Sequence, residues 1–315
     1  MSKKLISVII PAYNEEPNIA WFYGELQKGL FKSSDYAFET IFVDDGSSDA
    51  SLDVIKSLKG EHPHSVRYVS FSRNFGKEAA VSAGIHASKG EAVVIIDADG
   101  QHPIELIHEF LKRWEAGSEI VIGLRESNQK EGAVKKFGSK LFYAALSVVN
   151  GRNGVMPGST DFRLLDRKVV EEYNKLTERN RLTRNLIDWL GFKRTVVPFA
   201  ASARHAGTAA YSFRKLVKLA LNGIVAHSTR PLKLVGLLGF IISSISVVGT
   251  LFLIVEKYFL NDPLGLAVTG GAILALFLSF LVGVVLVCQG LLALYLESVY
   301  FETQNRPLYV VREQN

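Results

Sequence analysis

The sequence predicts an α/β domain with a mostly parallel sheet, followed by a transmembrane hairpin of two helices. Two observations lead to this fold class. Up to about residue 210, short apolar runs alternate with helical patterns, as expected when strands and helices alternate along a parallel sheet. Beyond Lys233, charged residues nearly vanish until Glu297, which indicates that a membrane part follows a water-soluble part.

The predicted strands are short apolar runs: Leu5–Ile10, Glu39–Val43, Val66–Ser70, Ala92–Ile96 and Ile120–Ile122. Between and after them, helices are expected near residues 17–30, 50–60, 77–88, 103–116 and 133–149. Runs without any polar residue, such as the VVII run at 93–96, indicate a sheet that is buried on both faces. In such sheets ligands bind beyond the carboxyl ends of the strands, so we looked for functional residues there.

Two charge-free runs predict the transmembrane helices. The first, Val235–Val255, has 21 residues and would form a helix about 31 Å long, close to the hydrocarbon thickness of a bilayer. The second runs from Pro263 to Leu296 and is long enough to cross with some tilt. Together they define a membrane domain over residues 235–296. The alternative is a pair of helices buried in a large soluble core.

Basic residues predict the orientation of this hairpin. Residues 211–234 contain five Lys or Arg and no Asp or Glu, and apolar residues from Phe213 to Val225 recur at helical spacing, which predicts an amphipathic juxtamembrane helix. An ordinary surface helix is the alternative. Basic residues also follow the second run, so the positive-inside rule places the domain 1–210 and the tail 297–315 in the cytoplasm, at the inner membrane.

Composition and missing motifs narrow the function classes. The net charge of +5 does not by itself indicate a nucleic-acid partner, and none is expected. The single cysteine, Cys288, rules out a disulfide within the chain and fits a reducing compartment. No GxGxxG motif follows the first predicted strand, and Gly76-Lys77 lacks the remaining residues of a P-loop. These absences argue against a dehydrogenase and a P-loop ATPase.

The segment Asp97-Ala98-Asp99-Gly100-Gln101 follows the fourth predicted strand. In an extended segment, residues i and i+2 point the same way, so both carboxylates would face one cation and Gln101 would add an amide oxygen. Such oxygen ligands suit Mg²⁺ or Mn²⁺. A solvated turn is the alternative for this triplet. Asp44 ends the second predicted strand, where its oxygens suit the N–H donors of a base or the hydroxyls of a ribose.

Four motifs occur in order with regular spacing: PAYNEE, VDDGSSD, SFSRNFGKEAA and DADGQHP. Together they resemble the family 2 glycosyltransferases of the GT-A fold. The segments Gly123–Arg125 and Thr160–Leu164, the Arg204 region and the two apolar runs extend the resemblance over nearly the whole chain. They make it similar to the polyprenyl-phosphate glycosyltransferases, namely the bactoprenol glucosyltransferases and the related dolichol-phosphate mannose synthases.

The resemblance implies an enzyme that transfers a sugar, glucose from UDP-glucose, to polyprenyl (undecaprenyl) phosphate at the cytoplasmic membrane face. UDP-N-acetylglucosamine, UDP-galactose and GDP-mannose remain open as donors. A phosphate monoester has a second pKa near 6 and is largely a dianion at neutral pH, so it needs no general base. We therefore expect one in-line displacement with inversion, in which the site aligns the reactants and neutralises charge.

The resemblance also implies roles for residues in the matching motifs. Those expected to bind the nucleotide-sugar are Pro11, Tyr13, Glu15, Asp44, Lys77 and Asp97. The expected metal ligands are Asp97, Asp99 and Gln101. Lys135, Lys136, Ser139 and Arg204 lie where the family binds the acceptor phosphate, while Asp161, Asp99 and Arg125 are expected to act in the transfer itself.

Several alternatives stay open at the level of the sequence. Lys77, Lys135 and Lys136 could be surface lysines, and Asp161 could cap a turn before a strand. Ala210 stands where family members often have a lysine, so a phosphate contact is missing there. A processive polysaccharide synthase lacks support, because no QxxRW motif follows Asp161. A non-catalytic membrane scaffold that partners a flippase is the rival of another class, and small residues such as Gly270-Gly271 would suit a homo-oligomer.

Overall fold

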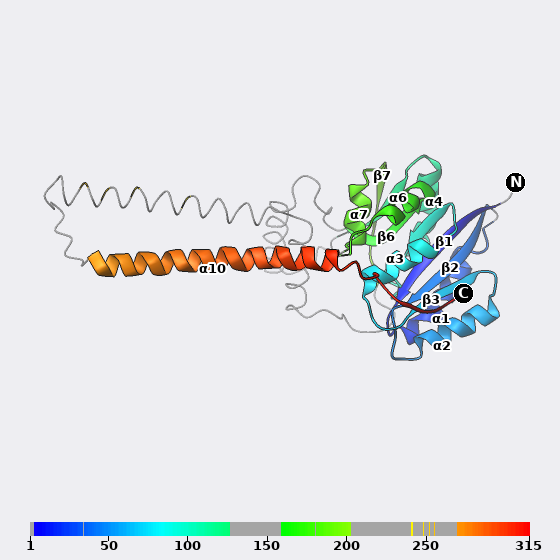
Figure 1. Ribbon diagram of the computed structural model, residues 1–315. Helices are drawn as coiled ribbons and strands as arrows, with labels where there is room; N and C mark the ends of the chain where they lie inside the picture. The colour runs from blue at the N-terminus through cyan, green and yellow to red at the C-terminus, as the bar shows by residue number, and fades with distance from the viewer. Residues whose placement is uncertain are drawn as a thin grey trace. The chain divides into compact units, whose positions relative to one another are not determined.

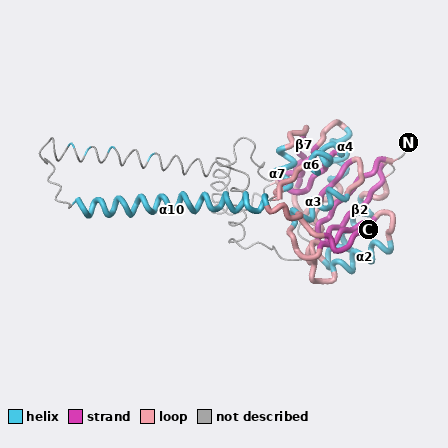
Figure 2. Tube along the Cα trace, in the orientation of Figure 1, coloured by secondary structure: helices cyan, strands magenta, loops and turns pink. Residues whose placement is uncertain are grey.

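The computed structural model describes residues 3–33, 35–126, 159–179, 181–202, 241, 248, 252, 255 and 270–315. These residues belong to two compact units. The first contains the described residues up to 202 together with the C-terminal segment 305–315, and the second contains a single long helix, α10 (Gly270–Thr303). The first unit contains the candidate site (Figures 1 and 2).

The first unit is built on one sheet with the strand order β7-β5-β6-β4-β1-β2-β3-β8. The strands are β1 (Lys4–Ala12), β2 (Tyr36–Asp44), β3 (Val66–Phe71), β4 (Ala92–Ile95), β5 (Ile120–Arg125), β6 (Ser159–Asp166), β7 (Arg194–Phe199) and β8 (Val311–Gln314). The helices are α1 (Glu16–Gly29), α2 (Ser51–Glu61), α3 (Lys77–Ala87), α4 (Leu106–Glu115), α6 (Arg167–Lys175) and α7 (Thr183–Trp189). The predicted alternation of strands and helices is thereby confirmed for the described residues.

Helices cover both faces of the sheet, as Figure 1 shows. Side chains alternate along each strand, so Val8 and Ile10 of β1 enter one hydrophobic cluster and Ile9 enters the other. The first cluster includes residues of α1, α2 and α4, and the second includes residues of α3, α6 and α7. Burial on both faces explains why the central strands are apolar throughout.

Strand direction determines where the site lies. The strands β4, β1, β2 and β3 are parallel, so their carboxyl ends meet at one edge of the sheet. By contrast, β6 runs antiparallel to β4, with Arg163 opposite Ile95. Continuing this register by two residues brings Asp161 opposite Asp97, just beyond the end of β4. The fold is therefore mostly parallel, as predicted, but its antiparallel member β6 brings a further carboxylate to the same edge.

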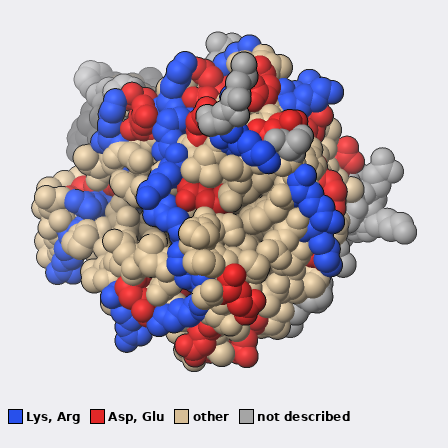
Figure 3. Space-filling view, turned by 90° about the vertical axis from the view of Figure 1, so that its right-hand side faces the viewer, with Lys and Arg blue, Asp and Glu red and all other residues tan. Residues whose placement is uncertain are grey.

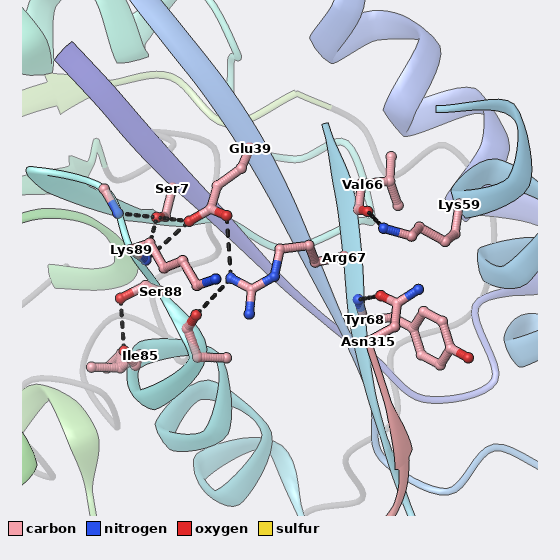
Figure 4. Close-up of polar contacts among 12 residues, drawn as sticks. Ser7, Glu39, Lys59, Val66, Arg67, Tyr68, Ile85, Ser88, Lys89 and Asn315 are labelled. Atoms are coloured by element: carbon pink, nitrogen blue, oxygen red, sulfur yellow. Dashed lines mark hydrogen bonds and ion pairs between the residues drawn. The ribbon is translucent and has the colours of Figure 1, made fainter. Parts of the chain in front are cut away.

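Polar contacts tie the opposite end of the sheet together. The buried carboxylate of Glu39 accepts hydrogen bonds from the Ser7 hydroxyl at 2.5 Å, the Lys89 N–H at 3.0 Å and Arg67 Nη1 at 3.2 Å (Figure 4). Arg67 Nη1 also donates to the Ala87 carbonyl at 2.8 Å. These contacts join β1, β2, β3 and the segment after α3. Removing one partner of such a buried pair leaves an uncompensated charge, so this end of the sheet is firmly held.

Charged side chains of both signs are interspersed over the face drawn in Figure 3. Exposed ion pairs, such as Lys4 with Glu115 at 2.8 Å and Lys28 with Glu25 at 2.7 Å, occur among the described residues. Each such pair contributes about 0–1 kcal/mol, because solvent screens it. Stability therefore depends mainly on the two hydrophobic clusters and on the buried polar contacts between strands.

The predicted membrane part is described only in places. Of the first apolar run, 235–255, the structure describes residues 241, 248, 252 and 255, all helical and exposed. The second run overlaps α10, which has 34 residues and exposes apolar side chains such as Leu278, Phe280 and Leu296. Across the described residues, no helix combines the length and apolar character required to cross a membrane. The predicted helices at 133–149 and 211–234 lie outside the described residues.

A glycine substitution tests how tightly the loops at the carboxyl edge are packed. Gly46 has a φ of +67°, and a Cβ there would lie 2.3 Å from the backbone carbonyl carbon of Arg73. We expect Gly46→Ala to lower the free energy of unfolding by about 2–4 kcal/mol, through backbone strain and overpacking. The matched control is Gly24→Ala within α1, where a Cβ meets nothing within 4 Å. The control should raise stability by about 0.5–1 kcal/mol. Equal stabilities of the two variants in denaturant titrations would contradict this packing argument.

Candidate active site at the carboxyl edge of the sheet

The loops after β1 and β2 are interlocked by hydrogen bonds. Asn14, which has a positive φ of 53°, accepts the Ser48 N–H at 2.8 Å through its side chain, and its own N–H donates to Ser47 Oγ at 3.0 Å. The Glu15 N–H donates to Ser51 Oγ at 2.8 Å. The PAYNEE and VDDGSSD segments therefore act as one preorganised surface. Tyr13, predicted to bind a nucleotide-sugar, is 46% exposed beside these contacts.

Asp44 is held at the end of β2 by two donors. One carboxylate oxygen accepts the Ser47 N–H at 3.1 Å, and the other accepts the Ser70 hydroxyl of β3 at 2.8 Å. The side chain is buried. Each oxygen retains a second lone pair for a ligand donor, so the predicted nucleoside contact is compatible with this geometry. Ser70 was not among the residues identified from the sequence.

Asp45 shapes the loop that leads into α3. Its carboxylate accepts the Phe75 N–H at 2.7 Å and the Gly76 N–H at 2.9 Å. Burial raises the pKa of Asp45 above its usual value, and the two N–H donors counter that rise only in part. Gly76 has a φ of 101°, and α3 begins at the next residue, Lys77. Asp45 therefore determines where α3 begins.

The ammonium group of Lys77 lies between two carboxylates from different strands. Its Nζ is 2.7 Å from Asp97 Oδ1 and 3.0 Å from Asp161 Oδ2. Burial lowers the pKa of Lys77, but the two carboxylates outweigh burial and raise it overall. Burial likewise raises the pKa of Asp161, while Lys77 and then Arg184 bring it below its usual value. All three groups are therefore charged at neutral pH.

The residues of the predicted metal motif lie in a turn rather than an extended segment. The strand β4 ends at Ile95, and Asp99 Oδ1 accepts the N–H of Gln101 at 3.0 Å. The expectation that Asp97 and Asp99 point the same way along an extended strand is therefore wrong, because the chain turns at Ala98–Gly100. Asp97 instead converges with Asp161 on one cation.

The donor chemistry at this edge suits a divalent ion. Carboxylate oxygens are the ligands that Mg²⁺ and Mn²⁺ prefer. The position of Lys77 Nζ shows that Asp97 and Asp161 can share one cation-sized position. Among the residues that the structure describes, no three His, Cys, Asp or Glu side chains converge in the manner of a complete metal site. Phosphate oxygens or waters would have to supply the remaining ligands.

A small pocket opens beside Lys77 and Asp161. It is lined also by Glu78, Val81, Ile95 and Thr183. Glu78 accepts the Thr183 N–H at 2.8 Å, which joins the first turns of α3 and α7. Burial and the nearby charge of Asp161 raise the pKa of Glu78. Neither Glu78 nor Thr183 was singled out from the sequence, since only the antiparallel strand β6 brings α7 to this edge.

The other predicted site residues fall into two groups. Arg125 ends β5 on the surface, Pro11 is within β1, and Gln101 is partly buried in the turn after β4. Asp161 lies inside β6 and does not cap a preceding turn, which removes that alternative. The predicted acceptor-phosphate residues Lys135, Lys136, Ser139 and Arg204 lie outside the described residues, as does Ala210.

Comparison with known proteins gives a consistent picture. Residues 7–174 match the family model described as Glycosyl transferase family 2. An uncharacterized glycosyltransferase of Synechocystis sp. is 40% identical, over 98% of this chain and 95% of the relative. A prophage-derived bactoprenol glucosyl transferase of Shigella flexneri is 34% identical, over 98% of both chains.

A solved structure is also similar in part. It is a mannosyltransferase from Pyrobaculum calidifontis in complex with GDP-Man and Mn²⁺, which is 16% identical. The match covers 72% of this chain and 63% of the mannosyltransferase, with a TM-score of 0.46.

A neutral replacement tests the role of Asp45. Asp45→Asn keeps one acceptor oxygen but loses the charge that accepts the Phe75 and Gly76 N–H groups. Because hydrogen bonds to charged groups are the stronger ones, we expect the free energy of unfolding to fall by about 1.5–3 kcal/mol. The control is Asp49→Asn, an exposed residue that accepts the Ser51 N–H at 3.0 Å. Its loss should be near zero, because Asn serves about equally well next to a helix start. Similar losses for both variants in urea titrations would count against a special role for Asp45.

Proposed function

The chain belongs to glycosyl transferase family 2, and from that premise we propose that it transfers a sugar from a nucleotide-sugar to a polyprenyl phosphate. UDP-glucose and undecaprenyl phosphate are the proposed substrates. The observation that supports this most is the charged cluster of Lys77, Asp97 and Asp161, placed at the sheet edge where such folds bind nucleotides. The choice of acceptor and of glucose follows relatives that are named bactoprenol glucosyl transferases over the full length of the chain.

The interlocked loops after β1 and β2 support a nucleoside site. Their backbone is held by side-chain hydrogen bonds, as in Asn14 with Ser48 and Asp44 with Ser70. A rigid surface loses little conformational freedom when a ligand binds, which favours affinity. In the proposal, Tyr13, Glu15 and Asp44 contact the nucleoside, while Lys77 faces the diphosphate.

A divalent ion, Mg²⁺ or Mn²⁺, is part of the proposal. Asp97 and Asp99 would hold it, with Gln101 as a further oxygen donor. When bound, such an ion stabilises the negative charge that develops on the leaving nucleoside diphosphate. Lys77 would then move from between Asp97 and Asp161 toward the phosphates, where its charge has the same effect.

The proposed reaction is a single displacement with inversion. A phosphate oxygen of the acceptor attacks the anomeric carbon, and the bond from that carbon to the nucleoside diphosphate breaks. The electron pair of the broken bond leaves with the diphosphate, so no proton has to move when the acceptor is a dianion. The protein has to hold the two phosphate groups in line and to offset their mutual repulsion.

The electrostatics of Asp161 bear on its role in this reaction. A general base works best with a pKa near the operating pH. The neighbouring cations instead keep the pKa of Asp161 below its usual value. We therefore propose that Asp161 orients Lys77 and the acceptor, and that it does not take up a proton.

The cytoplasmic face of the membrane is the proposed location. Support comes from the apolar side chains that α10 exposes, among them Leu274, Leu292 and Val299. Contact with lipid would remove this surface from water, at about 25 cal/mol per Å². If the proposal holds, the full chain sediments with membranes and resists extraction by salt and alkaline carbonate. Recovery in the supernatant without detergent would overturn it.

A donor screen tests the proposed function directly. Purified full chain is incubated with a short polyprenyl phosphate, Mg²⁺ or Mn²⁺, and each of UDP-glucose, UDP-N-acetylglucosamine, UDP-galactose and GDP-mannose. We expect release of nucleoside diphosphate with UDP-glucose that depends on the lipid, and loss of release on addition of EDTA. Lipid-dependent release that survives EDTA would remove the metal from the proposal, and no release with any donor would refute the acceptor class.

A double-mutant cycle tests whether Lys77 and Asp161 act as a unit. Lys77→Gln and Asp161→Asn should each lower turnover by roughly 10²-fold, because each removes charge preorganised at the reacting centre. The double variant should lose little more than either single variant, since residues that act together are not additive. Glu109→Gln, which removes an exposed charge paired with Arg113 at 2.6 Å, is the control and should retain turnover. Near-normal turnover of Asp161→Asn would dismiss a role at the reacting centre.

A further inference from the structure

The C-terminal segment 305–315 completes one edge of the catalytic sheet. Its strand β8 pairs antiparallel with β3, with Glu313 opposite Ser70 and Val311 opposite Phe71. Beyond the strand, the Ser72 N–H donates to the Val310 carbonyl at 3.0 Å. At the other end, the side chain of Asn315 accepts the Tyr68 N–H at 3.4 Å (Figure 4). The pairing therefore extends along the whole of β3 and into the segment that follows it.

A row of aromatic rings joins this segment to the start of α3. The ring of Tyr309 stacks on Phe71, with centroids 4.8 Å apart and planes 14° apart. Phe71 in turn contacts the ring of Phe75 edge-on at 5.7 Å. Burial raises the pKa of the Tyr309 hydroxyl, although Arg181 opposes the rise. The last ring of the row belongs to the residue whose N–H Asp45 holds, two positions before Lys77.

The strand that β8 supports touches both halves of the site. Through Ser70, β3 donates a hydrogen bond to Asp44 at 2.8 Å. Through Phe71 and Phe75 it packs under the loop that sets the position of Lys77. Since an edge strand has no second neighbour, removing β8 would leave this side of β3 unpaired next to the site.

We propose that Tyr309 and the strand β8 position Lys77, by holding β3 and the loop 72–76. Tyr309 is a positioning residue and does not touch the substrate. The segment follows α10 directly in the chain, so one continuous stretch of polypeptide contains the apolar helix and the support of the catalytic lysine. The kinetic part of this inference rests on the proposed function, whereas its conformational part does not.

The first test compares Tyr309→Ala with Tyr309→Phe by hydrogen exchange of the full chain. Loss of the ring should speed exchange of the Phe75 and Gly76 amides about tenfold, because an aromatic pair contributes roughly that factor. Tyr309→Phe keeps the stack and should match the unmodified chain. Glu313→Gln is the control within β8, since it removes only an exposed ion pair with Lys56 at 2.7 Å. Unchanged exchange at 72–78 in Tyr309→Ala, or an equal rise in α2, would overturn the inference.

The second test is kinetic and uses the donor found by the screen. Misplacement of Lys77 should raise the donor KM and lower kcat in Tyr309→Ala, by about tenfold in kcat/KM, with rescue in Tyr309→Phe. A change in acceptor KM alone would contradict the proposed action on the donor side. If the unmodified chain turns over no donor, the proposed function fails, while hydrogen exchange still decides the positioning role.

Discussion

The contact of Lys77 with both Asp97 and Asp161 is the interaction on which the rest of the site depends. Two carboxylates so close together would repel each other by about 1–4 kcal/mol in a partly solvated setting. The ammonium group makes their convergence favourable, and it lies 2.7 and 3.0 Å from them. This contact is available only because β6 runs antiparallel to β4 and brings Asp161 beside the end of that strand. Strand direction and charge therefore determine the geometry together.

Most of the neighbouring structure serves to fix where Lys77 begins its helix. Asp45 holds the two N–H groups that precede it. Gly46 leaves the room that the Arg73 backbone occupies, so the loops after β2 and β3 pack closely. From the other side, Phe71 and Tyr309 support the same loop through stacked rings. Because the supports come from β2, β3 and β8, the lysine is held by residues far apart in the sequence, which is what a preorganised site requires.

The sequence predicts the fold well where information is local. Apolar runs and helical spacing identify β1 to β5 and α1 to α4, since each element is recognised from its own residues. They do not reveal the direction of β6 or the pairing of β8 with β3, because both depend on partners distant in the chain. In the site, Asp44, Asp97 and Asp161 are recognisable as acidic residues in motifs. That Asp45 binds backbone and Lys77 bridges two strands depends on loop geometry, which no local pattern records.

The balance of charge at the carboxyl edge explains why a glycosyltransferase with this site would need further cations. Asp97, Asp99 and Asp161 contribute three negative charges around the single positive charge of Lys77. A nucleoside diphosphate adds more negative charge, and the proposed acceptor phosphate a further dianion. One lysine cannot offset this repulsion, which at close range reaches several kcal/mol in a partly buried site. A divalent ion held by Asp97 and Asp99 would reverse the sign of the field, and Arg125 at the exposed end of β5 is a second source of positive charge. The acidic cluster is therefore best understood as the half of an ionic site that the donor and its metal complete.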